Sequence, residues 1–121
     1  MVISQIVDPF FPECPIRNIL ARVLDKWSFL LLMVLDGYEQ RRFNQLLKDI
    51  PDISRRMLTQ TLRQLEADGL VERQVFAEVP LRVEYRLTPI ARTLTPLLKP
   101  LTSWALTNYA AIMENRRKYL Q

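Results

Sequence analysis

The most informative stretch of the chain is SRRMLTQTLRQLEADGLV, which occupies residues 54–71. Its apolar side chains recur with the spacing of one helix face: Leu58, Leu62 and Leu65. Ser54 is a favourable N-cap, and Gly69 is typical of the position just beyond the end of a helix. The stretch therefore predicts an amphipathic helix over residues 54–68.

The side of this helix away from the leucines carries polar residues that can all hydrogen-bond to DNA. Arginine pairs bidentately with guanine and glutamine with adenine, whereas serine and threonine reach phosphates or bases. A solvated helix face with Arg and Glu pairs has a similar composition, so the neighbouring elements must distinguish the two interpretations. The candidate residues are Ser54, Arg55, Arg56, Thr59, Gln60 and Arg63, of which we place Arg56, Gln60 and Arg63 deepest in a DNA groove.

Apolar residues at helical spacing predict three further helices upstream. The first begins at Pro15, the second covers residues 26–36 and is closed by Gly37, and the third must stop before Pro51. Their predicted inward-facing side chains are, in order, Ile16, Ile19, Leu20 and Val23; Trp27, Leu30, Leu31, Val34 and Leu35; Phe43, Leu46, Leu47 and Ile50.

Downstream, residues 70–77 and 82–87 are predicted to form a β-hairpin with its tip at 78–81. The second strand has the clearer pattern, because Val83, Tyr85 and Leu87 alternate with Glu84 and Arg86.

A helical region begins at Thr88, an N-cap followed by proline, and continues to about Arg117. Pro96 and Pro100 predict a kink or break within it. Its apolar stripe consists of Leu97, Leu101, Trp104, Ala105, Tyr109 and Ile112.

Helices, then a hairpin, then further helix describe a winged helix-turn-helix, a mainly α fold with a small β-hairpin. This order of elements favours DNA binding over a merely solvated face for the helix at 54–68. We predict one domain over residues 1–121: an N-terminal arm at 1–14, a DNA-binding core at 15–87 with the wing near 77–82, and C-terminal dimerisation helices at 88–121.

The composition argues against enzymatic chemistry. The chain has no histidine, which removes the commonest general base and the commonest neutral metal ligand. Its two glycines, Gly37 and Gly69, lie in no run that wraps phosphate. We therefore expect no enzyme, no catalytic residue, no cofactor and no metal site. The excess of 17 basic over 13 acidic residues, a net charge of +4, suits a polyanionic partner.

The single cysteine, Cys14, cannot form an internal disulfide, which fits a reducing cytoplasm. The strongest apolar run, residues 27–35, is far shorter than the roughly 20 residues that span a bilayer. The N-terminus lacks the pattern of a signal peptide. We expect a cytoplasmic protein without membrane contact.

Several segments occur together in one known family: Cys14-Pro15, Asp25-Lys26-Trp27-Ser28, Arg42-Phe43, Ile53-Ser54-Arg55-Arg56-Met57-Leu58-Thr59, Leu62-Arg63-Gln64-Leu65-Glu66-Ala67-Asp68-Gly69-Leu70-Val71, Val83-Glu84-Tyr85 and Leu87-Thr88. Through them, residues 14–105 resemble the HxlR family of bacterial winged helix-turn-helix regulators, relatives of the MarR group. The chain departs from the family at Leu24, where the family usually has glycine, so the link between the first two helices is expected to be tighter or more helical.

The resemblance implies a homodimer whose N-terminal arm and long C-terminal helix form the interface, with a recognition helix and a wing on each protomer addressing a roughly palindromic operator. The arm contributes Phe10 and Phe11, which lie between two prolines, and the helix contributes the stripe from Leu97 to Ile112. In some relatives the matching cysteine senses oxidants or electrophiles, which makes Cys14 the candidate redox-sensing residue.

Further basic and polar residues are candidates for holding phosphate: Lys26, Arg42 and Asn44 near helix N-termini, and Arg82 at the hairpin tip. For Lys26 the alternative is a solubilising role. Arg73, on the first strand of the hairpin, could also reach a minor groove or phosphates, as could Arg82, and the alternative for Arg73 is pairing with Glu72 or Glu84.

A helix N-terminus and nearby Arg17 favour a reactive thiolate at Cys14, although a buried, inert cysteine is the common alternative. The effector is left open between an oxidant and a small molecule. Trp27, Trp104 and Tyr109 are candidates for a ligand pocket, or else belong to the core or the interface. The competing function is a winged-helix protein-interaction module, whose recognition face would be acidic or apolar.

Overall fold

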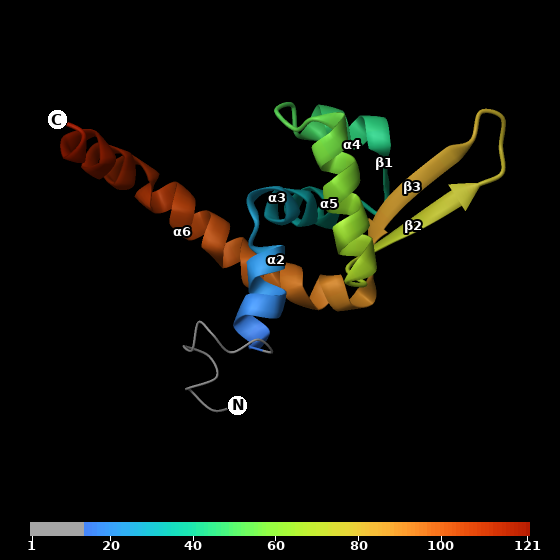
Figure 1. Ribbon diagram of the computed structural model, residues 1–121, viewed down its shortest axis with the longest axis horizontal. Helices are drawn as coiled ribbons and strands as arrows, with labels where there is room; N and C mark the ends of the chain where they lie inside the picture. Colours follow the sequence, from blue (N-terminus) through green and yellow to red (C-terminus); the bar gives the residue numbers. More distant parts are fainter. Residues whose placement is uncertain (1–13) are drawn as a thin grey trace.

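The computed structural model describes residues 14–121 (Figure 1). The predicted arm, including Phe10 and Phe11, lies outside the described residues except for Cys14. The elements follow in the order η1 (Ile16–Leu20), α2 (Ala21–Val23), α3 (Lys26–Asp36), β1 (Arg41–Arg42), α4 (Phe43–Asp49), α5 (Arg55–Ala67), β2 (Val71–Phe76), β3 (Arg82–Leu87) and α6 (Pro89–Tyr119).

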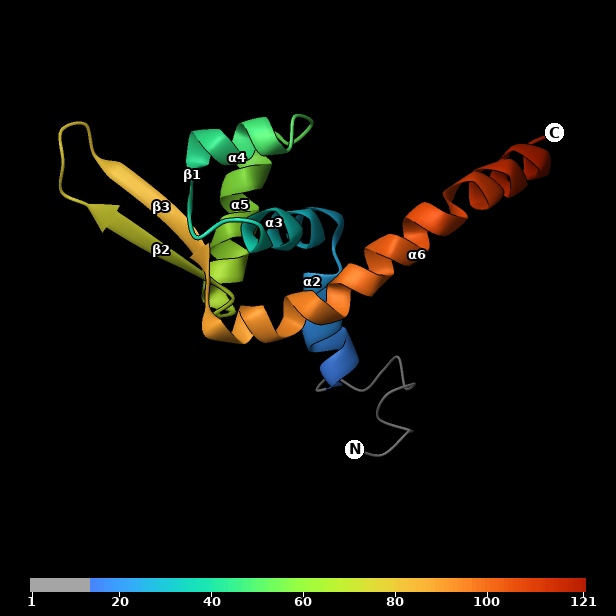
Figure 2. The ribbon, with the colours of Figure 1, turned by 180° about the vertical axis from the view of Figure 1, so that it is seen from behind.

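Helices α3, α4 and α5 form a group beside a three-stranded antiparallel sheet with the order β1-β3-β2. The β2–β3 hairpin projects from this group, and α6 passes along the base of the group before it extends away (Figures 1 and 2). The predicted fold class, mainly α with a small β-hairpin, is confirmed.

The core forms where the three helices meet, and the hairpin and the first turns of α6 close it from below. Burial of these apolar side chains is the main source of the stability of the fold. The helices contribute Leu31, Leu32, Leu35, Leu46, Leu58, Leu62 and Leu65, and the closing elements contribute Val71, Leu87, Ala91 and Leu98.

Two side chains that the helical spacing places in the core are exposed, Ile19 to 59% and Leu30 to 39%. Ile19 lies in η1, a π-helical stretch whose wider turns shift the face that α-helical spacing would set. Helix α3 is apolar on nearly every side, so the pattern alone did not select its inward face. The buried positions of α3 are Ser28, Leu31, Leu32 and Leu35.

The link between the first two helices keeps its helical hydrogen bonding at Leu24, whose backbone N–H donates to the carbonyl of Leu20 at 2.8 Å. Asp25 then begins α3, because its carboxylate accepts from the backbone N–H of Trp27 at 3.3 Å. Helix α2 therefore ends at Val23, with Leu24 as the turn before α3, and a link that is tighter or more helical than in the family stays a prediction.

The third strand, β1, was not predicted. Arg41 lies opposite Tyr85 and Arg42 opposite Glu84, so the short strand joins the helices to the hairpin. Arg41 also donates to both carboxylate oxygens of Asp49, at 2.9 and 2.7 Å, which ties β1 to the end of α4. A strand of this length is too short to show the alternation that identifies a strand in sequence.

Helix α6 is continuous through Pro96 and Pro100, so a break does not occur. Each proline lacks a backbone N–H and removes one hydrogen bond from the helix. In both views the ribbon changes direction after its first turns, in the part that contains the prolines (Figures 1 and 2). The predicted kink is therefore present as a bend within one helix.

Asp36, the last residue of α3, joins the core to α6. Its carboxylate accepts from the Thr95 hydroxyl at 2.7 Å and pairs with Lys99 at 3.0 Å and Arg92 at 3.2 Å. Arg92 also donates to the backbone carbonyls of Asp36 and Tyr38, both at 3.0 Å, which satisfies acceptors left at the end of α3. The Thr95 hydroxyl, with help from Lys99 and Arg92, lowers the pKa of Asp36.

We expect Asp36→Asn to lower the free energy of unfolding at pH 7 by about 2 kcal/mol, because hydrogen bonds to a charged group are lost. A lowered pKa in the folded state means that this stabilisation is present above the unfolded value, about pH 4, and is lost as the pH falls through the folded value. Urea unfolding at several pH values should show that the free energy of unfolding falls less steeply with decreasing pH in Asp36→Asn than in the wild type.

Asp52→Asn is the matched control, because Asp52 is exposed and the same charge is removed. Its acid profile should follow that of the wild type. Identical acid profiles for Asp36→Asn and wild type would contradict the role given to Asp36.

Candidate nucleic-acid interface

Helix α5 is fixed at both ends. At its start the Ser54 hydroxyl oxygen accepts from the backbone N–H of Met57 at 3.0 Å, as the N-cap prediction requires. At its end Gly69 has φ of +75°, a conformation that glycine adopts without strain. The C-cap residue Asp68 accepts two hydrogen bonds from Arg22, at 2.7 and 3.0 Å, which attaches α2 to the end of α5. The helix therefore presents a fixed outer face.

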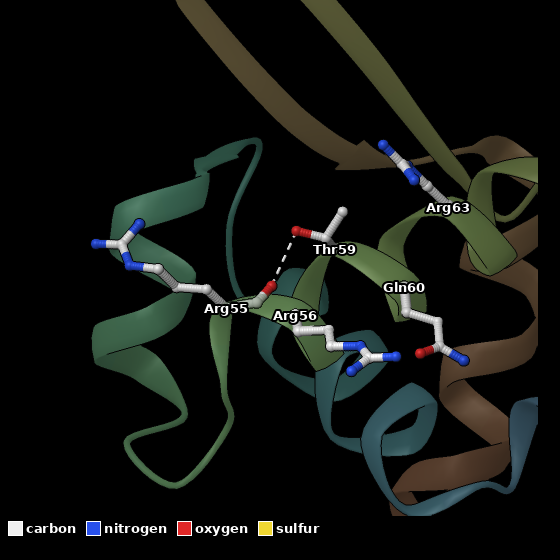
Figure 3. Close-up of a pocket in the computed structure, with 5 residues that line it drawn as sticks. All are labelled: Arg55, Arg56, Thr59, Gln60 and Arg63. Carbon is white, nitrogen blue, oxygen red and sulfur yellow. Dashed lines mark hydrogen bonds between the residues drawn. The ribbon is translucent and has the colours of Figure 1, made fainter.

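The outer face of α5 forms one open concave surface, drawn in Figure 3. Arg56 and Gln60 extend in the same direction, whereas Arg55 extends beside α4 and Arg63 points toward the hairpin (Figure 3). The residues that line the surface are Arg55, Arg56, Thr59, Gln60 and Arg63, all of them predicted from the sequence.

The arginines of this surface are available to a partner. Arg55, Arg56 and Arg63 are exposed, and none of them forms an ion pair with any residue in the described part of the chain. Thr59 is less available, because its hydroxyl donates to the backbone carbonyl of Arg55 at 2.9 Å. The alternative of a solvated face neutralised by Arg and Glu pairs is therefore not what the structure contains.

A second groove lies between the start of α4 and the hairpin tip, and it brings together Arg42, Asn44 and Arg82. The backbone N–H of Arg42 donates to the side chain of Gln45 at 2.8 Å, so Arg42 begins α4. Lys26 does not line this groove; its ammonium lies 4.2 Å from the ring centroid of Trp27 at the start of α3.

Arg82 lies along the hairpin. Its guanidinium is 3.2 Å from Glu78 and 3.5 Å from Glu84, and it stacks over the ring of Phe76 at 4.0 Å. These contacts leave 28% of the side chain exposed. Arg82 is therefore held by the protein in a way that the arginines of α5 are not.

A family model described as HxlR-like helix-turn-helix matches residues 22–113. The chain belongs to this family. It is 42% identical over 95 residues to the HTH-type transcriptional regulator YdeP of Bacillus subtilis, an alignment covering 78% of this chain and 73% of YdeP. The family resemblance inferred from the sequence is confirmed, and this HxlR-like chain is a transcription regulator, not an enzyme.

Solved structures show the same winged helix-turn-helix fold. The redox regulator HypR in its oxidized form is 40% identical, with a TM-score of 0.73 over 78% of this chain and 97% of that one. Diamide-treated YodB from B. subtilis is 31% identical, with a TM-score of 0.67 over 79% and 92% of the two chains.

In this HxlR-like chain the predicted interface stripe on α6 is largely open to solvent. Leu97 is 70% exposed, Trp104 60% and Tyr109 61%. Leu101 and Ala105 are also exposed, and Ile112 is half-buried. Of the three aromatic residues suggested for a ligand pocket, Trp27 packs against the core, whereas Trp104 and Tyr109 are exposed on α6.

Cys14 is fully buried. Its backbone carbonyl accepts from both the backbone and the side-chain amide of Asn18, at 2.9 and 3.1 Å, where η1 begins. Within residues 14–121 no group of three or more His, Cys, Asp or Glu side chains is arranged to hold a metal ion. Over the same residues, no helix combines the length and apolarity needed to cross a membrane.

Proposed function

We propose that this chain is a sequence-specific double-stranded DNA-binding regulator that acts as a homodimer. Helix α5 is the recognition helix and enters the major groove, and the β2–β3 hairpin is the wing at the flanking groove. The observation that carries this proposal is the set of three exposed arginines on α5 without ion pairs. Such a surface is complementary to a polyanion and is placed near the N-terminus of α5, where recognition helices contact base edges.

The directions of the side chains separate the residues that suit base edges from those that suit phosphates. Arg56 and Gln60 extend together, which suits contacts to guanine and adenine edges. Arg55 extends beside α4 (Figure 3), with its guanidinium carbon 6.0 Å from the ring centroid of Phe43. Arg42 and Asn44 flank Phe43 in the sequence, and these polar residues suit phosphates that fix the register of the protein on DNA. The proposed set of DNA contacts is completed by Ser54, Thr59, Arg63, Lys26 and Arg82.

A winged-helix module that binds another protein is the competing function. Such a module would present an acidic or apolar face on α5. Arg55, Arg56 and Arg63 make that face basic, and the relatives are named as transcriptional regulators. Both observations favour DNA.

We expect Arg56→Ala to weaken binding to the chain's own upstream promoter fragment by about tenfold or more, since a bidentate base contact is worth about 1–3 kcal/mol. Fluorescence anisotropy with a scrambled fragment, at several salt concentrations, measures this change. Arg117→Ala is the matched control, because it removes the same charge near the end of α6, where Arg117 pairs with Glu114. Equal binding of folded, dimeric wild type to both fragments would favour the interaction module.

The dimer is proposed from the apolar stripe on α6. Side chains as large as Leu97, Trp104 and Tyr109 at 60% exposure or more form a surface that a second copy would cover. The outer part of α6 extends away from the core, which leaves the stripe accessible (Figure 2). Phe10 and Phe11 of the arm are proposed to join the same interface.

Leu101→Glu should convert the protein to a monomer, because a carboxylate would be buried without a partner at the interface. Analytical ultracentrifugation measures the change in mass. Ser103→Glu is the control: Ser103 is two residues further along α6, on the opposite side, and is also exposed to solvent. A dimer that survives Leu101→Glu unchanged would place the interface elsewhere.

We also propose that modification of Cys14 controls DNA binding. HypR is named a redox regulator, and YodB has been treated with the thiol oxidant diamide. With one cysteine per chain, diamide takes two electrons and two protons either from the Cys14 thiols of two protomers, which form a disulfide, or from Cys14 and a small thiol, which form a mixed disulfide. Diamide is reduced to its hydrazine in both cases. Because Cys14 is fully buried, either reaction displaces the segment before η1.

Diamide should weaken promoter binding by the wild type, with an expected change of about 5- to 150-fold for a coupling of this kind. Cys14→Ser should bind equally well with and without diamide. If diamide releases Cys14→Ser from the promoter fragment as it releases the wild type, the thiol-switch proposal is wrong, while the DNA-binding proposal is unaffected. If diamide leaves the wild type bound, a small-molecule effector becomes the better hypothesis.

A further inference from the structure

A third recess lies between α5 and the hairpin, and the two hairpin residues that line it are not among the proposed DNA contacts. Helix α5 contributes four of its lining residues and the two long strands contribute one each. Arg63 points from α5 toward the hairpin (Figure 3). The lining residues are Thr59, Leu62, Arg63, Glu66, Arg73 and Tyr85.

The strand register determines which hairpin side chains reach this recess. Val71 lies opposite Leu87, and both are buried on the face toward the helices. Side chains two positions along a strand share a face, so Arg73 and Tyr85, which are also opposite one another, lie on the same side. The recess therefore receives Arg73 from the hairpin and Arg63 from α5.

The outer face of the hairpin, in contrast, is neutralised. Glu72 and Arg86 are cross-strand partners with a separation of 3.0 Å, which lowers the pKa of Glu72 and raises that of Arg86. Arg82 is paired with Glu84 and Glu78. The carboxylates of the hairpin are thus engaged by the arginines on its outer face.

Arg63 and Arg73 remain uncompensated. Neither forms an ion pair within the described part of the chain, and Glu66, which also lines the recess, is not within ion-pair distance of either guanidinium. Leu62 forms an apolar wall of the recess, and Tyr85 offers a hydroxyl donor. Two arginines therefore line the recess, and neither of them forms an ion pair with its one lining carboxylate, Glu66. Such a pair of arginines is complementary to one anionic group with several acceptor oxygens.

We propose that this recess binds one phosphate group, a phosphodiester of the DNA backbone, between Arg63 and Arg73. The inference rests on the proposed function and deepens it. With α5 in the major groove and the hairpin at the flanking groove, the DNA backbone that separates the two grooves crosses the junction of α5 and the hairpin. Arg73, near the base of the wing, then fixes the angle at which the wing meets DNA.

Arg73→Gln and Arg86→Gln provide a matched pair. Each removes one positive charge from the same hairpin, but Arg73 lines the recess, whereas Arg86 is paired on the opposite face. Loss of one phosphate contact lowers the slope of log K against log salt by about 0.9. Between about 50 and 200 mM salt, the ratio of variant to wild-type dissociation constants should then shrink by about 3.5-fold per contact, or about 12-fold for both protomers. Arg86→Gln should leave the ratio constant.

Anisotropy titrations of the promoter fragment with the two variants measure these slopes. Equal slopes for Arg73→Gln and wild type, with promoter binding still weakened by Arg56→Ala, would overturn the inference and leave the proposed function intact. Absence of promoter binding by folded, dimeric wild type would overturn both.

Inorganic phosphate alone distinguishes the source of the phosphate group. We expect no saturable binding at millimolar concentrations when the amide signals of α5 and β2 are followed by NMR at constant ionic strength. Saturable binding that Arg73→Gln abolishes, together with an unchanged salt slope on DNA, would show that the recess takes a free phosphate compound and would overturn the DNA assignment.

Discussion

The burial of one leucine stripe on α5 is the constraint on which the rest of the structure depends. Leu58, Leu62 and Leu65 pack into the core shared with α3, and full burial of each such side chain is worth about 1.5–3 kcal/mol. Rotation of α5 about its axis would expose these leucines and bury arginines without partners, which is costly. The outward direction of Arg56 and its neighbours therefore follows from the packing of the opposite face. The candidate site is thus the polar face of α5, and packing of the apolar face against the core sets its direction.

In the proposed dimer, the same core must be connected to α6 for two recognition helices to be placed on DNA. Asp36 provides that connection, since it is the end of α3 and binds Thr95, Arg92 and Lys99 of α6. The bend of α6 begins in the region of these contacts and directs the outer part of the helix away from the core (Figure 2). In the proposed dimer, the orientation of the core and the geometry of the interface would be coupled through one carboxylate and one bent helix.

The parts of this architecture that the sequence predicts are those specified by local signals. The Ser54 cap, the leucine spacing and Gly69 bound α5 to within a residue of the prediction. Strand β1 was missed because its residues join the sheet only through long-range pairing with Tyr85 and Glu84. The prediction of which α3 side chains face the core was partly wrong, because a helix that is apolar on nearly every side shows little periodicity. The sequence did not decide whether Arg73 pairs with Glu72 or Glu84, because the register between the two strands is not determined by local sequence. In that register Glu72 lies opposite Arg86, and Arg73 lies opposite Tyr85.

Ion pairing, more than net charge, distinguishes the functional surface from the rest of the molecule. Arg22, Arg41 and Arg92 are engaged with Asp68, Asp49 and Asp36, and these pairs hold elements together. The arginines of α5 and Arg73 have no such partners among the described residues, so their charge is available to a polyanion. An arginine that is paired with a carboxylate is less available to DNA than an arginine without such a partner. Within residues 14–121, the placement of the acidic residues therefore determines which arginines of α5 and the hairpin are left without an ion pair.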